Sequence, residues 1–195
     1  MRRGFKEEAK RLALEVREEL QLGSHEPLDP RDLADLYGAP IFPLHELASY
    51  DCPAEAITYF SNVRQATFSA ALVLLGSARF IVDNSAHADT RRRVSIGHEL
   101  AHIVLEHDFV TTLLTLDGCR AVDKEIEGEA DRLGGELLIP YQAALTAGRA
   151  AWTDDQVARH YNVSRQFAAM RMNASGARKV AERQRANRRT VSLQP

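Results

Sequence analysis

The residues at positions 98–102, His-Glu-Leu-Ala-His, constrain this chain more than any other feature of its sequence. Residues four positions apart lie on one face of an α-helix, so His98 and His102 can converge on a single divalent metal ion. Glu99 lies beside them and can accept a proton from a water on that ion without being a ligand itself. The pattern therefore predicts a metal-binding helix, over residues 90–107.

A catalytic zinc ion usually has three protein ligands, so the two histidines need a third partner. The extended pattern HExxHxxGxxH is absent, because the chain has Leu105 and Asp108 where that pattern requires glycine and histidine, and His107 is one position out of register. Cys52 and Cys119 stand apart and lack the paired spacing of cysteine ligands. A carboxylate from a second helix is the remaining source.

The segment 123–138, DKEIEGEADRLGGELL, is a predicted helix that begins acidic and ends apolar. Glu127 and Asp131 are four positions apart and therefore share one face of it. We predict that Glu127 is the third zinc ligand, with Glu129 as the alternative. Asp131 is expected to accept the N–H of a ligating imidazole, which fixes the tautomer of that ring.

Two segments together, RRRVSIGHELAH at 91–102 and EIEGEADRLGGELLIP at 125–140, resemble the ImmA/IrrE family of bacterial zinc peptidases. Members typically have HELxH and then E-x-x-A-[N/D]-x-F-A-x-x-L-L-x-P. The likeness extends over roughly residues 5–145. The chain departs from the pattern at Leu133 and Gly134, and a glycine inside a helix costs about 1 kcal/mol relative to alanine. The matching positions of the second segment are Glu127, Ala130, Asp131, Leu137, Leu138 and Pro140.

The resemblance implies a regulatory endopeptidase. Family members typically cleave a DNA-binding repressor, often of the XRE helix-turn-helix type, and so switch on stress-response or mobile-element genes. On this chain it implies that Zn²⁺ is the cofactor and that Glu99 is the general base. The implied zinc ligands are His98, His102 and Glu127.

The sequence leaves two functional questions open. The first is which group stabilises the negative charge on the substrate carbonyl oxygen, because the sequence alone does not choose among His87, Tyr141 and His160. The second is whether the chain cuts its partner. The alternatives are a non-catalytic regulator that binds DNA or a repressor, and a toxin or antitoxin component that retains the fold. Glu99 favours an enzyme, since a pure binder has no use for a base beside the metal.

The composition is typical of a folded intracellular protein. The 195 residues are 45% hydrophobic and 27% charged, which is enough for one core with a small appendage. The first twenty residues lack the apolar segment of a signal peptide, and the longest apolar run, 70–75, is too short to span a membrane. We therefore expect a cytoplasmic protein.

The pattern of apolar residues predicts the α+β class, with a small antiparallel sheet packed against helices. The expected core is zincin-like and contains the active-site helix and the ligand helix. Thr90 is the expected N-cap of the active-site helix. The other expected elements are helices at 5–22 and 31–37, an edge strand at 39–44, and an apolar region at 56–83 that completes a sheet of about three strands.

We expect three parts along the chain. Residues 1–150 form the zinc metallopeptidase domain, 151–175 a helix-turn-helix-like segment, and 176–195 a basic, mobile tail. Direct contact with nucleic acid is conceivable for the last two parts. Alternatively, the helical segment completes the core, which would bury the apolar side chains of Val157, Tyr161, Val163, Phe167 and Met170.

Overall fold

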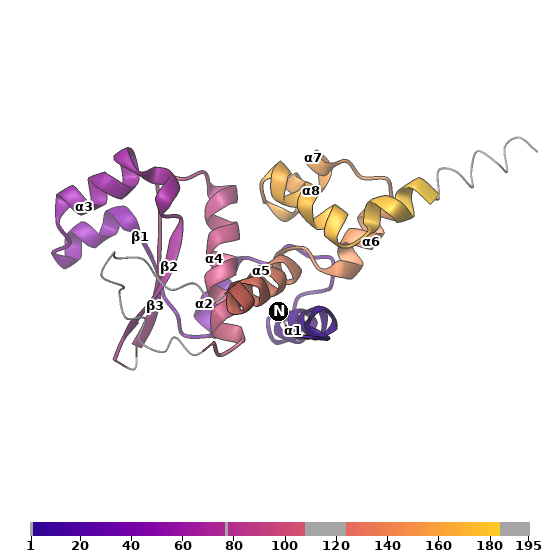
Figure 1. The fold of residues 1–195 in the computed structure, drawn as a ribbon, viewed down its shortest axis with the longest axis horizontal. Coiled ribbons are helices and arrows are strands. Elements are labelled where there is room, and N and C mark those ends of the chain that lie inside the picture. The colour runs from indigo at the N-terminus through magenta and orange to yellow at the C-terminus, as the bar shows by residue number, and fades with distance from the viewer. Residues whose placement is uncertain (1, 77, 108–123, 184–195) are drawn as a thin grey trace, which may run out of the picture.

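The structure, a computed structural model, describes residues 2–76, 78–107 and 124–183. It confirms the α+β class, with a three-stranded sheet on one side and most of the helices on the other (Figure 1). Helix α4 (Asp89–Val104) lies between the sheet and the group of helices at the right of Figure 1. Among the described residues, no helix is long and apolar enough to cross a membrane.

The N-terminal helices form where local signals place them. Helix α1 (Phe5–Glu19) buries Phe5, Ala9, Ala13 and Val16, the spacing of one helical face. It ends before residue 22 because Gln21 adopts a left-handed conformation with φ of 57°. Helix α2 (Pro30–Leu36) follows its N-cap Asp29, whose carboxylate accepts the Arg31 N–H at 3.0 Å.

The sheet has the strand order β1-β3-β2. Strands β2 (Ala70–Leu75) and β3 (Ala78–Asp83) pair antiparallel, as expected for the sheet. Strand β1 (Ile41–Pro43) is at the edge as expected, but it runs parallel to β3. The sheet is therefore mixed and not wholly antiparallel.

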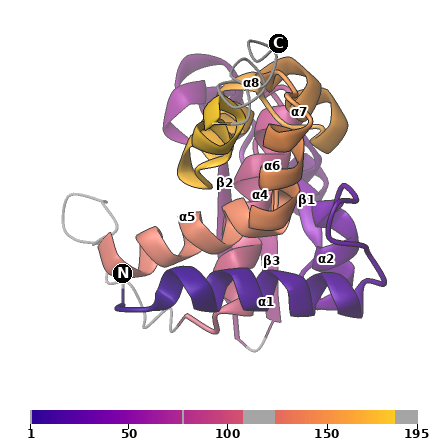
Figure 2. The same ribbon diagram turned by 90° about the vertical axis from the view of Figure 1, so that its right-hand side faces the viewer.

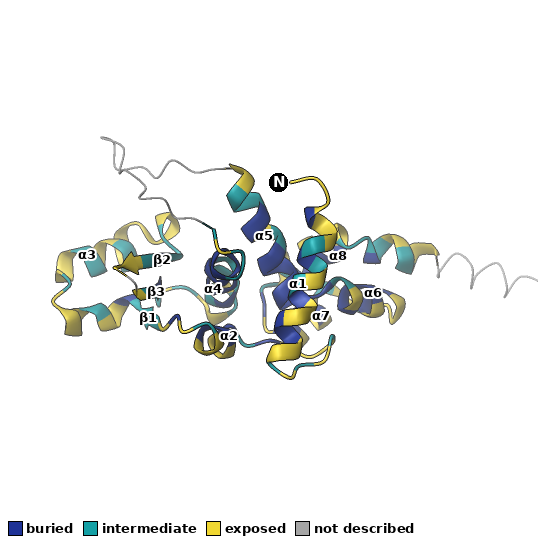
Figure 3. Cartoon of the chain, turned by 90° about the horizontal axis from the view of Figure 1, so that it is seen from below, coloured by how far each residue is buried: buried dark blue, intermediate teal, exposed yellow. Residues whose placement is uncertain are grey.

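The chain between β1 and β2 is helical, although residues from 56 onward were expected to contribute strands. Strands β1 and β2 lie at opposite edges of the sheet with β3 between them, so the crossover that joins them passes from one edge to the other. Its helix α3 has no buried residue, so its β-forming side chains have no sheet to pack on (Figure 3). The crossover consists of a 3-10 helix (Leu44–Tyr50), α3 (Ala54–Thr58), a π-helical turn (Tyr59–Val63) and a 3-10 turn (Gln65–Thr67).

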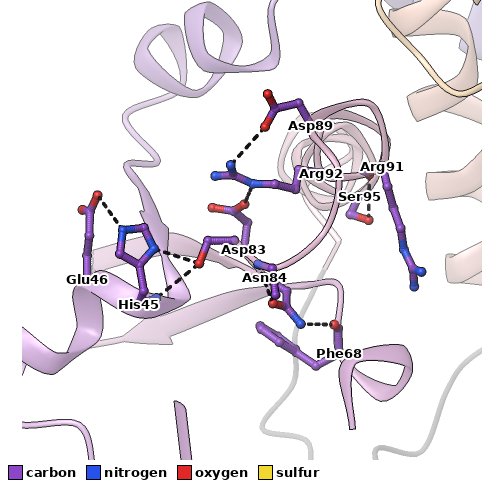
Figure 4. Close-up of polar contacts among 11 residues, drawn as sticks. His45, Glu46, Phe68, Asp83, Asn84, Asp89, Arg91, Arg92 and Ser95 are labelled. Carbon is purple, nitrogen blue, oxygen red and sulfur yellow. Dashed lines mark hydrogen bonds and ion pairs between the residues drawn. The ribbon is translucent and has the colours of Figure 1, made fainter. Parts of the chain in front are cut away.

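The start of α4 is fixed to the end of β3 by an ion pair (Figure 4). Arg92 of α4 pairs with the buried carboxylate of Asp83 and also, at 3.2 Å, with Asp89. The helix begins at Asp89 after Ala88, so Thr90 is not its N-cap. Arg93 is buried and donates to the Leu28 carbonyl at 2.6 Å, which ties α4 to the segment before α2.

Helix α5 (Lys124–Leu138) packs against α4 on one side and α1 on the other (Figure 2). Gly134 makes the first of these contacts possible, because a Cβ there would lie 3.0 Å from the carbonyl oxygen of Gly97. At Gly134, where the chain departs from the family pattern, the absence of a side chain therefore allows α4 and α5 to approach closely. Leu133 is fully buried beside it.

The C-terminal helices α6 (Tyr141–Arg149), α7 (Asp154–Tyr161) and α8 (Arg165–Ala174) form a second hydrophobic cluster with the end of α5. Thr153 and Gln156 form a capping box at the start of α7, and Ser164 caps α8. The side chains expected in the core are buried or partly buried, except that Met170 is 48% exposed. Most of the predicted basic tail, 184–195, lies outside the described residues, as does the connection 108–123.

Two buried arginines hold the C-terminal end of α5. Arg17 of α1 donates to the Leu137 carbonyl at 2.8 Å, and Arg171 of α8 donates to the Ile139 carbonyl at 2.7 Å. Arg171 also pairs with the buried Glu136 at 3.0 Å. Carbonyl groups at a helix C-terminus carry partial negative charge and favour such cations. The ligand helix is thus anchored from both ends of the chain.

Candidate metal centre

Three side chains with metal-binding atoms meet where α4 and α5 pack together. His98 and His102 come from α4 and Glu127 from α5, and their ligand atoms all lie within 4.8 Å of one another. His98 Nε2 is 3.1 Å from both His102 Nε2 and Glu127 Oε2. Two imidazole nitrogens and one carboxylate oxygen are the donor set of a catalytic zinc site. The residues present therefore fit a zinc ion.

The contact between Gly97 and Gly134 sets the distance between the ligand-bearing helices. A Cβ on Gly134 would lie 3.3 Å from the Cα of His98, so a larger residue there would push α5 away from the first histidine. Glu127 precedes Gly134 by seven residues, which is about two helical turns on the same face. The close approach of the two backbones thus brings the glutamate within reach of both imidazoles.

Asp131 accepts a hydrogen bond from the ring of His98. Its Oδ1 is 3.0 Å from Nδ1, so in the neutral ring the proton is on Nδ1 and the lone pair of Nε2 faces Glu127. Burial disfavours the charged form of His98, but the bond to Asp131 and the surrounding carboxylates outweigh it and raise the pKa of this imidazole. The bond to His98 in turn lowers the pKa of Asp131. Surroundings that stabilise an imidazolium also favour a metal cation.

Glu99 lies next to His98 on α4, and only 8% of its surface is exposed to solvent. Its Oε2 accepts the backbone N–H of Leu72 at 3.0 Å. Leu72 belongs to β2, which is at the edge of the strand order. The carboxylate is thus held between the metal-binding helix and the sheet.

Glu129, the alternative third ligand, is outside the group of His98, His102 and Glu127. Its carboxylate accepts hydrogen bonds from the backbone N and the side-chain Nε of Arg2, at 2.9 and 3.0 Å. Burial alone would raise the pKa of Glu129, but these bonds outweigh it and the pKa is lowered. The structure therefore brings Glu127, and not Glu129, to the two histidines.

His107 contacts the site although the sequence placed it out of register for a ligand. Its Nδ1 is 2.9 Å from the Nδ1 of His102, and its Nε2 is 3.8 Å from Glu129 Oε2. Burial lowers the pKa of His107. The sequence signal for this contact is the position of His107 three residues after the last residue of α4. Arg2, by contrast, gave no signal, because 127 positions separate it from Glu129.

The three candidates for stabilising the substrate oxyanion make other contacts. His87 precedes α4, and its Nε2 is 2.9 Å from the Gln65 carbonyl oxygen. The ring of Tyr141 lies 3.8 Å from the Nζ of Lys10. The Nε2 of His160 is 3.1 Å from the backbone oxygen of His25. The described residues therefore favour none of the three for this role.

A comparison with models of protein families matches residues 49–173 to the IrrE N-terminal-like domain, Peptidase_M78. Comparisons with curated proteins and with solved structures give no match. The matched range is well over half of the chain and includes both α4 and α5. It begins in the crossover after β1 and ends in α8. The chain therefore belongs to the IrrE N-terminal-like domain family and has a metallopeptidase-type fold.

Proposed function

We propose that this protein is a zinc-dependent endopeptidase that cleaves a partner protein, namely a helix-turn-helix repressor of the XRE type. The observation that supports the chemistry is the convergence of His98, His102 and Glu127, with the buried Glu99 on the same helix. The choice of substrate rests on the resemblance to peptidases that inactivate repressors. Cleavage of the repressor would switch on the genes that it controls.

The ligand set gives each side chain a separate task. His98, His102 and Glu127 would hold the zinc, and the bond to Asp131 would keep the proton of the neutral His98 ring on Nδ1, so that Nε2 can bind the metal. When bound, zinc supplies a Lewis acid that polarises the scissile carbonyl and makes a water molecule more acidic. The carboxylate ligand and the acidic surroundings limit the net positive charge of the loaded site.

Glu99 is the proposed general base and, afterwards, the general acid. Its carboxylate accepts the proton of the attacking water and then returns that proton to the nitrogen of the leaving amine. The hydrogen bond from the Leu72 amide fixes the orientation of this carboxylate. Because Glu99 is largely buried, its charge acts in a medium of low dielectric, where electrostatic effects are strong.

The decisive experiment incubates the purified full chain with the product of an adjacent repressor gene, with added zinc or with a chelator. We expect zinc-dependent fragments of the repressor. Glu99→Gln should still bind zinc and should cleave about 10²–10⁴-fold more slowly. The matched control is Glu18→Gln, an exposed glutamate of α1, which should cleave at the parent rate.

Two results would overturn the proposal. If Glu99→Gln cleaves as fast as the parent, the proposed base is wrong. If the parent binds the repressor or DNA but leaves the repressor intact with zinc present, the non-catalytic regulator is the better description.

A further inference from the structure

The end of α4 folds back so that His107 lies over His102. The His107 N–H donates to the His102 carbonyl at 3.1 Å, and the Glu106 N–H donates to the Ile103 carbonyl at 3.0 Å. These two bonds form a Schellman motif, which brings the second residue after the helix cap against the residue three positions before the helix cap. Glu106 has φ of 49°, a left-handed conformation that glycine usually supplies at this position. The chain thus keeps a strained residue that holds His107 in place.

The two imidazoles have one arrangement of protons that suits a ligand. For His102 to offer its Nε2 lone pair toward His98 and Glu127, its proton must be on Nδ1. That N–H then donates to the Nδ1 of His107 at 2.9 Å. The proton of His107 is consequently on Nε2, which has no hydrogen-bond partner among the described residues and lies 3.8 Å from Glu129 Oε2, close enough for electrostatic attraction. Each proton in this row points away from the candidate metal position.

Glu129 is the negative end of the row and is held by Arg2. Its side chain is 5% exposed, and it accepts bonds from the Arg2 backbone N and from Nε at 2.9 and 3.0 Å. A buried carboxylate needs such donors in order to remain charged. The row therefore runs from Arg2 through Glu129 and His107 to His102.

We propose that His107 is a positioning residue for the ligand His102, and that Glu129 and Arg2 support it in this role. His98 has the common arrangement, in which a carboxylate accepts the proton of the ligand directly. At His102 a second imidazole stands between the ligand and the carboxylate. This inference rests on the metal site of the proposed function, but not on the identity of its substrate.

The test measures metal binding by the full chain without any cleavage assay. Zinc dissociation constants are obtained by competition with a chromophoric chelator, and the visible absorption of the cobalt(II)-loaded protein reports the ligand geometry. His107→Leu should weaken zinc binding about 10–100-fold and change the cobalt spectrum. His107→Asn, which keeps an acceptor near the His102 N–H, should restore most of the affinity. Glu129→Gln should show a weaker loss in the same direction.

The matched control is His25→Asn, which changes an exposed histidine and should leave both readouts unchanged. Zinc affinity of His107→Leu within twofold of the parent, with the same cobalt spectrum, would overturn the inference. If His107→Leu does not fold, Glu129→Gln and Arg2→Gln decide in its place. Arg2 is 57% exposed, so its replacement leaves the core intact. Parental affinity and spectrum in both would overturn the inference.

The outcomes separate this inference from the proposed function. A parent protein that binds neither zinc nor cobalt overturns both. If the parent binds metal but His107→Leu and Glu129→Gln bind it equally tightly, only the positioning role of His107 and Glu129 is overturned. Losses of affinity in these variants, in a protein that cleaves no repressor, support the row and contradict the proposed substrate.

Discussion

The α-carbon of Gly134 faces the carbonyl oxygen of Gly97 so closely that a Cβ on Gly134 would lie 3.0 Å from that oxygen. The obstacle is backbone, which cannot rotate away as a side chain can. The spacing of α4 and α5, and with it the distance between the histidines and Glu127, depends on this contact.

Gly134→Ala should therefore destabilise the protein although alanine favours helices. We expect a loss of roughly 1–3 kcal/mol, as is usual for overpacking, and a melting temperature lower by several degrees. Gly128→Ala is the control on the same helix, because a Cβ there meets nothing within 4 Å. It should stabilise by up to about 1 kcal/mol. Equal stabilisation by both changes would refute the close-contact explanation.

Glu127→Gln should abolish tight zinc binding. The change removes a charged ligand, so we expect a loss greater than the 10–100-fold that is typical of an outer-shell residue. The exposed Glu125 of the same helix provides the control, since Glu125→Gln should bind zinc like the parent. Chelator competition measures both. Unchanged affinity of Glu127→Gln would mean that another group is the third ligand.

The pair of Asp131 and His98 predicts how the stability of the metal-free protein depends on pH. The pKa of Asp131 is lowered in the folded protein. The stability that this carboxylate contributes is therefore complete above about pH 4, the pKa of an unfolded aspartate, and is lost as pH falls through the folded pKa. The pKa of His98 is raised in the folded protein. The stability that this imidazole contributes is therefore complete below about pH 6.5, the pKa of an unfolded histidine, and is lost as pH rises through the folded pKa.

Asp131→Asn should therefore lower the melting temperature most between about pH 4 and 6.5, and the difference should fade toward pH 9. The carboxylate is 76% exposed, so at most about 1 kcal/mol is expected, or roughly 2–4 °C. Melting curves in chelator measure it. Asp155→Asn, which breaks an exposed pair with Arg165, should show no such pH trend. A difference for Asp131→Asn that persists at pH 9 would contradict the assignment.

Arg171→Met should be strongly destabilising. It leaves the buried Glu136 without its cation and the Ile139 carbonyl without its donor, and breaking a buried pair costs about 3–5 kcal/mol. Arg165→Met, on the exposed face of the same helix, should cost less than about 1 kcal/mol. Chemical unfolding measures both. If the two variants were equally stable, the buried pair would contribute nothing beyond a surface pair.

The features that could be predicted from sequence are those set by residues close together in the chain. The four-residue spacing of His98 and His102 puts them on one face of α4, and Asp29 caps α2 as its side chain and the following proline indicate. Glu127 and Asp131 likewise share a face of α5, and both reach His98.

What could not be predicted depends on contacts between distant segments. The parallel pairing of β1 with β3 is invisible in a short apolar run, and the helical crossover contains residues that usually favour strands. Gly134 was expected only to cost helix stability, because the approach of α4 is a property of the packed pair. The bonds of Arg2 to Glu129 have no local pattern at all.

The two buried arginines at the end of α5 bear on where a shortened version of this protein can be cut. The range that matches the family starts at residue 49, so a fragment with those limits would keep Arg171 but lose Arg17. The face of α5 that packs on α1 would then meet water, and the Leu137 carbonyl would lose its donor. The smallest autonomously folding unit should therefore extend well upstream of the matched range, to include the whole of α1.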